Sequence, residues 1–279
     1  VKGPSAAALY CSRAANGVIQ ITTKSGERNQ DEIGVTFSTE VSATQAYEFV
    51  DYQNEYGGGS STAFRTLDGR DYHKSETDQY YVQYSIDESF GPRLDGRPTR
   101  QWYSWDDVNG LEGEATPWEA HPDAVRDFLQ TGLTYENNLA LSDGGESYNF
   151  RVSLNSSNTT RGVSPNSEMD RYQVRFNGSF DLSDDLTATT VARYSDRSAE
   201  GRAGTGYEFA NNPMAPFNTF TQRQLDYGPG SYMRDYARPN GQQRGWNYSS
   251  IEGTQGVTSF EFTDNPYTTQ FENYQSDSR

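Results

Sequence analysis

The chain begins with VKGPSAAALYCSRAANGVIQITTKSG, residues Val1–Gly26, in which a helix signal is followed by a strand signal. Pro4 suits the first turn of a helix, and the strong helix formers of Ala6–Tyr10 come directly after it. The pair Asn16-Gly17 then predicts a tight turn. The β-branched run Val18–Thr23 predicts a strand. This stretch therefore predicts a short helix, a turn and a strand.

Downstream of this stretch, apolar and polar residues alternate in five segments. In Ile33–Ala43 the odd positions are mostly apolar and the even positions are small or polar. Such a period of two is typical of a strand with one apolar and one polar face. The length suits the roughly 9–11 residues with which a tilted strand crosses a membrane. The same alternation returns at Leu133–Ser142, Tyr148–Leu154, Tyr172–Asp181 and, more weakly, Leu186–Tyr194.

Two classes of protein differ in what covers the apolar face of such strands. In a soluble sandwich this face packs on a second sheet, whereas in a membrane barrel it faces lipid. In the barrel, the polar face with Arg151, Arg175 and Arg193 points to the lumen or to a plug.

The lengths of the connections favour the barrel. Tight turns are predicted at Asp143–Glu146 and Ser183–Asp185. Long connections are predicted at about 44–130, at about 156–170 and from residue 198 onward. This alternation of short and long links is typical of outer-membrane barrels, which have short turns on the periplasmic side and long loops outside.

The composition fits neither an ordinary soluble domain nor a disordered chain. Apolar residues make up 33% of the 279 residues and the mean hydropathy is −0.92, which is low for a domain of this size. Aromatic residues nevertheless reach 14%, which argues against disorder. A barrel wall with long wet loops has this composition, and so does a secreted β-rich binding protein. The net charge of −16 argues against binding to nucleic acid.

No pattern of residues predicts catalysis, a metal site or a cofactor. The histidines His73 and His121 lack a metal-ligand spacing, and for His121 a packing or capping role is favoured. Pairs of carboxylates are expected by chance among 39 acidic residues, and no serine lies in a nucleophile elbow. The run Gly57-Gly58-Gly59 lacks the lysine of a phosphate loop and is predicted to be a flexible link. We therefore predict that the protein is not an enzyme.

Val1–Gly26 resembles the end of the plug domain in SusC/RagA-like TonB-dependent outer-membrane transporters, with Cys11 at a position where the family has glycine. The plug-motif residues are Gly3, Ser5, Arg13, Asn16 and Gly17. Later stretches agree with the resemblance: Tyr52–Gly57, Asp87–Gly96, Thr116–Trp118, His121–Asp123 and Asn265–Tyr267.

The resemblance implies an all-β fold, a transmembrane antiparallel β-barrel of about 22 strands in the parent protein, with an internal plug. Residues 1–26 would be the C-terminal end of the plug domain. Residues 27–279 would be the N-terminal part of the barrel, with external loops at about 44–130 and 198–279. The chain would then be part of a longer polypeptide.

The resemblance also implies a function in the bacterial outer membrane, namely TonB-dependent import of oligosaccharides or peptides. The protein would be the channel subunit of a complex with a SusD-like surface lipoprotein, which caps the external side. The TonB–ExbB–ExbD system would supply energy through a plug segment that precedes residue 1. No cofactor and no nucleic-acid partner is implied.

Aromatic residues in the two long loops are the candidate contacts for a ligand or partner. Tyrosine and tryptophan offer flat apolar faces with a polar edge, which suit sugar rings or a protein surface. The candidates are Trp102, Tyr103, Trp105, Trp118, Tyr207, Trp246 and Tyr248. The other interpretation is that such residues pack the loops against one another or form an interfacial girdle.

A competing hypothesis is a secreted β-sandwich, either a carbohydrate-binding module or a fragment of a glycosidase. It would explain the aromatic residues and the acidity, but not the alternation of short and long connections. A structural surface-layer protein is a third possibility. A module dissolves in buffer, whereas a barrel needs detergent.

Overall fold

The computed structural model describes residues 19, 24–28, 32–66, 80–82, 84–105, 110–207, 211–237, 239, 241, 243–247, 265–272 and 275–278. The predicted helix Ala6–Tyr10 lies outside these residues, as do the plug-motif residues and all of the predicted strand Val18–Thr23 except Ile19. The chain divides into two compact units. The sheet unit comprises residues 1–39, 137–155 and 172–195, and the loop unit comprises residues 40–136, 156–171 and 196–279.

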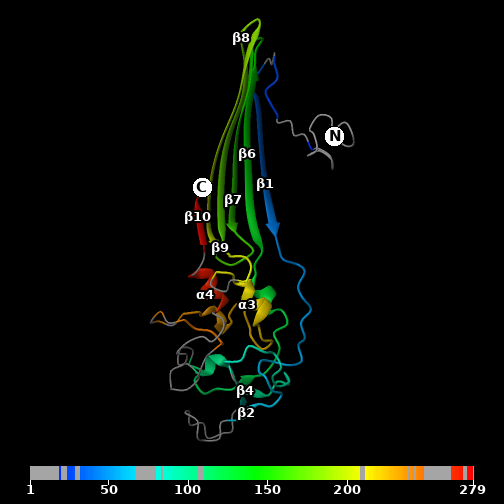
Figure 1. The fold of residues 1–279 in the computed structure, drawn as a ribbon, viewed down its shortest axis with the longest axis vertical. Helices are drawn as coiled ribbons and strands as arrows, with labels where there is room; N and C mark the ends of the chain where they lie inside the picture. The colour runs from blue at the N-terminus through cyan, green and yellow to red at the C-terminus, as the bar shows by residue number, and fades with distance from the viewer. Residues whose placement is uncertain are drawn as a thin grey trace. The chain divides into compact units, whose positions relative to one another are not determined.

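Long strands form a six-stranded sheet with the order β1-β6-β7-β8-β9-β10 (Figure 1). The strands are β1 (Gly34–Thr44), β6 (Gly132–Gly144), β7 (Tyr148–Arg161), β8 (Glu168–Ser183), β9 (Leu186–Arg202) and β10 (Gln275–Ser278). The five strands predicted from alternation are therefore confirmed, in an antiparallel arrangement of successive neighbours. The sheet is open in the part of the chain that the structure describes, with β1 and β10 at its edges. No closed barrel is seen there, and the barrel of about 22 strands stays a prediction for the parent protein.

The turns at one end of the strands are short, as predicted. β6 ends at Gly144 and β7 begins at Tyr148, while only Asp184 and Asp185 separate β8 from β9. Backbone and side-chain hydrogen bonds fix the register: the Asp181 amide donates to the Ser147 carbonyl at 2.8 Å, and Thr187 donates to the Asp181 carboxylate at 2.7 Å.

The connection predicted at about 156–170 is much shorter in the structure. β7 continues to Arg161 and β8 begins at Glu168, so the strict alternation of short and long links is wrong here. The strand continues because polar side chains pair across it. Thr134 and Thr159 share a hydrogen bond of 3.0 Å, and Asn158 donates to Asp170 at 2.8 Å. Such pairs stabilise a strand without an apolar face.

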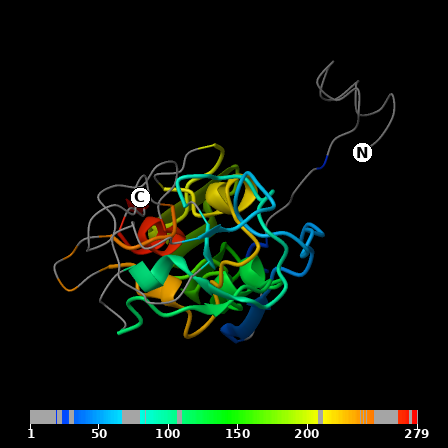
Figure 2. The same ribbon diagram turned by 90° about the horizontal axis from the view of Figure 1, so that it is seen from below.

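The loop unit contains a small sheet and several short helices. The sheet has the order β2-β3-β4-β5, with β3 and β4 parallel. Its strands are β2 (Arg65–Thr66), β3 (Tyr80–Tyr81), β4 (Pro98–Arg100) and β5 (Thr116–Pro117). The helices are η2 (Trp102–Trp105), α2 (Ala124–Phe128), α3 (Met214–Thr219), η3 (Tyr232–Arg234) and α4 (Pro266–Phe271). Figure 2 shows them as short coils among long irregular segments. Within the described ranges, every helix is too short or too polar to span a membrane.

The two long regions predicted as loops share one aromatic core. Phe128, from the first region, lies with its ring centroid 4.9 Å from those of Phe217 and Tyr267, from the second. Polar contacts also join the regions: the buried Arg223 guanidinium donates to the Asn54 side chain at 2.9 Å. These regions therefore fold together and are not independent loops.

The glycine run predicted as a flexible link is packed, so this prediction is wrong. The Gly57 amide donates to the Pro92 carbonyl and the Gly91 amide to the Gly57 carbonyl, both at 3.0 Å. A Cβ atom at Gly91 would overlap the carbonyl of Gly58, and one at Gly57 would overlap the ring of Trp118. The glycines permit this close approach of backbone to backbone and to an aromatic ring.

We expect Gly91→Ala to destabilise the loop unit by about 1–3 kcal/mol, because the added methyl group overpacks a backbone contact. Tryptophan fluorescence during urea unfolding measures this, since Trp102, Trp105, Trp118 and Trp246 all lie in that unit. Ser60→Ala, at an exposed position of the same segment, is the control and should change little. An unfolding midpoint unchanged by Gly91→Ala would contradict the packing described.

Candidate functional site

In the sheet unit, the segment that precedes β1 is attached near the short turns. The Arg28 guanidinium forms a two-pronged ion pair with the Asp181 carboxylate and donates to the Glu146 carbonyl at 3.1 Å. The Asn177 side chain donates to the Lys24 carbonyl at 2.9 Å. Residues from β8 and from the turn between β6 and β7 therefore hold this segment, and the two-pronged geometry fixes the orientation of Arg28.

Close backbone contacts complete this attachment. A Cβ atom at Gly26 would overlap the Phe150 carbonyl, and one at Gly144 would overlap the Glu27 carbonyl. The segment thus reaches the strands through two glycines that leave no room for side chains. We call Lys24–Arg28, with Asn177 and Asp181, the anchor.

The anchor lies on the polar face of the sheet unit. On this face Asn155 donates to Asn138 at 2.7 Å and Gln173 donates to Ser195 at 3.3 Å. The half-buried Arg151 and Arg175 lie on the same face, because each is an even number of residues from Asn155 or Gln173 on the same strand. The other face of the same strands carries the apolar residues.

The loop unit contains a cleft of about 210 Å³ that brings together both long regions. It is lined by Gln101, Trp102, Tyr103, Thr116, Pro117, Glu119, His121, Gln224, Asp226, Gly230, Ser231, Tyr232 and Met233. The rings of Tyr103 and Tyr232 lie with their centroids 4.2 Å apart. We call this feature the tyrosine cleft.

Hydrogen bonds and charges order the tyrosine cleft. The Tyr103 and Thr116 hydroxyls are 2.8 Å apart, and Asp226 accepts a hydrogen bond of 2.8 Å from the Gly228 amide. Burial raises the pKa of Tyr103, and the carboxylates of Asp226 and Glu119 raise it further. His121 Nδ1 lies 4.0 Å from the Asp226 carboxylate. The two carboxylates therefore act electrostatically on the aromatic part of the cleft.

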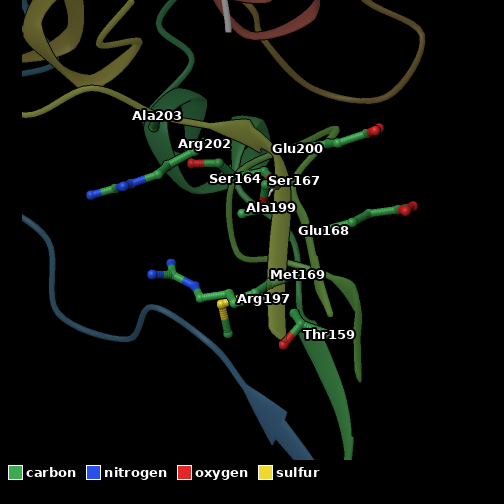
Figure 3. A pocket seen from close by; sticks show the side chains of 10 residues that line it. All are labelled: Thr159, Ser164, Ser167, Glu168, Met169, Arg197, Ala199, Glu200, Arg202 and Ala203. Carbon is green, nitrogen blue, oxygen red and sulfur yellow. Dashed lines mark hydrogen bonds between the residues drawn. The ribbon is translucent and has the colours of Figure 1, made fainter. Parts of the chain in front are cut away.

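A second hollow, of about 290 Å³, lies where β7 and β9 end and β8 begins (Figure 3). Arg197 and Arg202 extend to one side of the strands, whereas Glu168 and Glu200 extend to the other. The Ser167 hydroxyl donates to the Ser164 carbonyl at 3.0 Å and closes the connection between β7 and β8. Because its charged groups point away from one another, this hollow does not present a convergent set of polar groups.

The structure gives the predicted contact residues different surroundings. All four tryptophans of the chain are almost fully buried in the core of the loop unit, namely Trp102, Trp105, Trp118 and Trp246. Tyr103 lines the tyrosine cleft, Tyr207 is 76% exposed, and Tyr248 lies outside the described residues. The buried tryptophans pack the loops together in this conformation. A contact with a ligand or partner stays a prediction for this set.

Several groups of the tyrosine cleft were not among the predicted contacts. Glu119, Asp226 and Tyr232 lie far apart in sequence, and no motif links them to Tyr103. The packing or capping role given to His121 stays a prediction: its backbone carbonyl accepts from the Ala124 amide at 3.2 Å, and the residue lines the cleft. In the part of the chain that the structure describes, no group of three or more His, Cys, Asp or Glu side chains is arranged to hold a metal ion.

Comparison of the chain with models of known protein families gives no match, and comparison with characterised proteins gives none either.

We expect Arg28→Ala and Asp181→Ala each to release the anchor, because either change removes the two-pronged ion pair. The rate of cleavage by Glu-C protease measures this release, because Glu27 and Glu32 lie on either side of Arg28 and become easier to cleave when the segment detaches. The double variant should be cleaved no faster than either single variant, because both changes remove the same contact. Asp185→Ala, in the nearby turn, is the control. Rates that multiply in the double variant would contradict a shared contact.

Proposed function

We propose that the chain forms part of the wall of a bacterial outer-membrane β-barrel, in the channel subunit of a TonB-dependent importer of oligosaccharides or peptides. One observation carries the proposal: the apolar face of β7, β8 and β9 is exposed in the sheet unit. The importer class comes from the resemblance of Val1–Gly26 to the plug of SusC/RagA-like transporters.

Among the residues that the structure describes, large apolar side chains on this face are exposed and not covered by protein. Leu154 on β7, Val174 on β8 and Tyr194 on β9 are 44%, 41% and 66% exposed. Other exposed large apolar side chains in the sheet unit include Leu141, Tyr148, Tyr172, Phe180, Leu182 and Leu186. A continuous apolar surface of this kind is not stable in water and marks an interaction with protein or membrane.

The dimensions of the apolar band fit a bilayer. From Tyr172 to Leu182, at about 3.3 Å per residue, β8 covers about 33 Å, which a tilt of about 40° reduces to about 25 Å. This equals the height of the apolar band in outer-membrane barrels. Tyr172 and Tyr194 lie at one end of the band and Tyr148 lies at the other, as in aromatic girdles.

The opposite face fits the interior of a barrel. It carries polar pairs and arginines, and the segment before β1 is anchored on it through Arg28 and Asp181. A chain that leaves an internal plug and enters the wall would approach from this face. Because β1 and β10 have free edges in the described part of the chain, further strands would be needed to close a barrel.

The exposure of the apolar face argues against the competing β-sandwich. In a sandwich this face would pack on a second sheet and its side chains would be buried. Within the sheet unit they are not buried. The two long regions follow β1 and β9 in the chain, at the strand ends opposite the short turns. In an outer-membrane barrel such connections are external loops, where a SusD-like lipoprotein and the imported ligand would bind.

Two adjacent cysteine variants test the membrane wall. In full-length protein with Cys11→Ser, reconstituted in vesicles, Val174→Cys and Gln173→Cys are labelled with a fluorescent probe. Brominated lipid should quench the probe at position 174 and not at 173, because neighbouring residues of a strand face opposite sides. Equal quenching at both positions, or none at either, would overturn the proposal.

Growth measures the import function separately. A strain without this protein should lose growth on one oligosaccharide or peptide mixture as sole carbon source, and a strain without TonB should lose the same growth. Normal growth of both strains on every such source would exclude the importer while leaving the membrane wall intact.

A further inference from the structure

We propose that the tyrosine cleft binds an alkylammonium group of a soluble ligand. The group could be the side chain of a lysine or the amino terminus of a peptide, which share the same chemistry. This site belongs to the loop unit alone and does not depend on whether the sheet unit crosses a membrane.

The charge of the cleft favours a cation. Its lining includes two carboxylates, Glu119 and Asp226, and neither lysine nor arginine. The negative charge extends to its surroundings: burial raises the pKa of Asp127, and the carboxylates of Asp123 and Asp226 raise it further. An ammonium group placed here would reduce repulsion among these carboxylates, whereas an anion would increase it.

The aromatic groups provide a second reason. Tyrosine rings attract cations through their negative faces, at distances up to about 6 Å from the ring centroid. Tyr103 and Tyr232 lie side by side and both line the cleft. We do not assign this role to Trp102, because the buried Arg244 already lies 5.7 Å from its ring centroid.

Acceptors for the ammonium hydrogens are also present. An ammonium group donates three hydrogen bonds and accepts none. The Gln101 side-chain amide donates to the Pro117 carbonyl at 3.2 Å and keeps its carbonyl oxygen as an acceptor. Ser231 lines the cleft with a buried hydroxyl that has no hydrogen-bond partner among the described residues. Buried polar atoms in proteins are normally hydrogen-bonded, so a ligand that donates to this hydroxyl oxygen would supply the missing bond.

The volume of the cleft limits the size of the ligand group that it can bind. Its volume of about 210 Å³ is below the roughly 300 Å³ at which pockets begin to hold a whole drug-sized ligand. A single side chain or chain end fits this volume better than an oligosaccharide. An uncharged sugar could stack on the tyrosines but would gain nothing from the net charge of Glu119 and Asp226.

Calorimetric titration of the full-length protein tests the proposal with matched probes. Nα-acetyl-lysine amide presents a side-chain ammonium, and alanyl-alanine amide presents an amino terminus. Their fully acetylated forms and maltotriose are the neutral probes. One or both ammonium probes should bind, and the acetylated forms should bind about tenfold more weakly or not at all. Equal or tighter binding of an acetylated form or of maltotriose would overturn the proposal, as would no binding of either ammonium probe.

Variants locate the site. The double variant Glu119→Gln, Asp226→Asn should lower the affinity for the ammonium probe about tenfold or more. The variant Tyr232→Leu should also lower this affinity. Glu114→Gln, an exposed acid of the same unit outside the cleft lining, is the matched control and should leave binding unchanged. The tryptophan-fluorescence unfolding midpoint shows that each variant is folded. A folded double variant that binds as tightly as the original protein would overturn the assignment.

Discussion

The period of two in extended backbone is the constraint on which the sheet unit depends. It places polar pairs such as Asn138 with Asn155 and Gln173 with Ser195 on one face, and it necessarily places the intervening apolar residues on the other. The polar face can be satisfied by side-chain hydrogen bonds and by the anchor. The apolar face cannot be satisfied within the sheet, so its exposure is a property of the pattern itself. In the barrel that we propose, the apolar face would meet lipid and the polar face would meet the interior.

The loop unit follows a different rule, because its stability comes from aromatic packing between regions far apart in sequence. Phe128 contacts Phe217 and Tyr267, and Arg223 bonds to Asn54. Glycines at positions 57 and 91 allow the backbone to approach closely where side chains would not fit. The stretches Tyr52–Gly57 and Asp87–Gly96 meet in this packing.

Strands with strong alternation could be predicted from the sequence, and the segment Ser156–Arg161 could not. Its residues are polar on both faces, so its strand character depends on partners such as Thr134 and Asp170. The core of the loop unit was missed for a related reason: its aromatic residues follow no period. In the tyrosine cleft, Tyr103 was identified by residue type alone. Glu119 and Asp226 were not identified, because their convergence is set by tertiary packing and not by spacing.

The anchor also has a mechanical consequence. It holds Lys24–Arg28 by several bonds that lie side by side on β8 and the neighbouring turn, directly before β1 begins. A force that pulls the chain upstream of Lys24 would load these bonds together, before any tension reached the ladder of β1. The edge strand β1 would therefore keep its register for as long as the anchor holds.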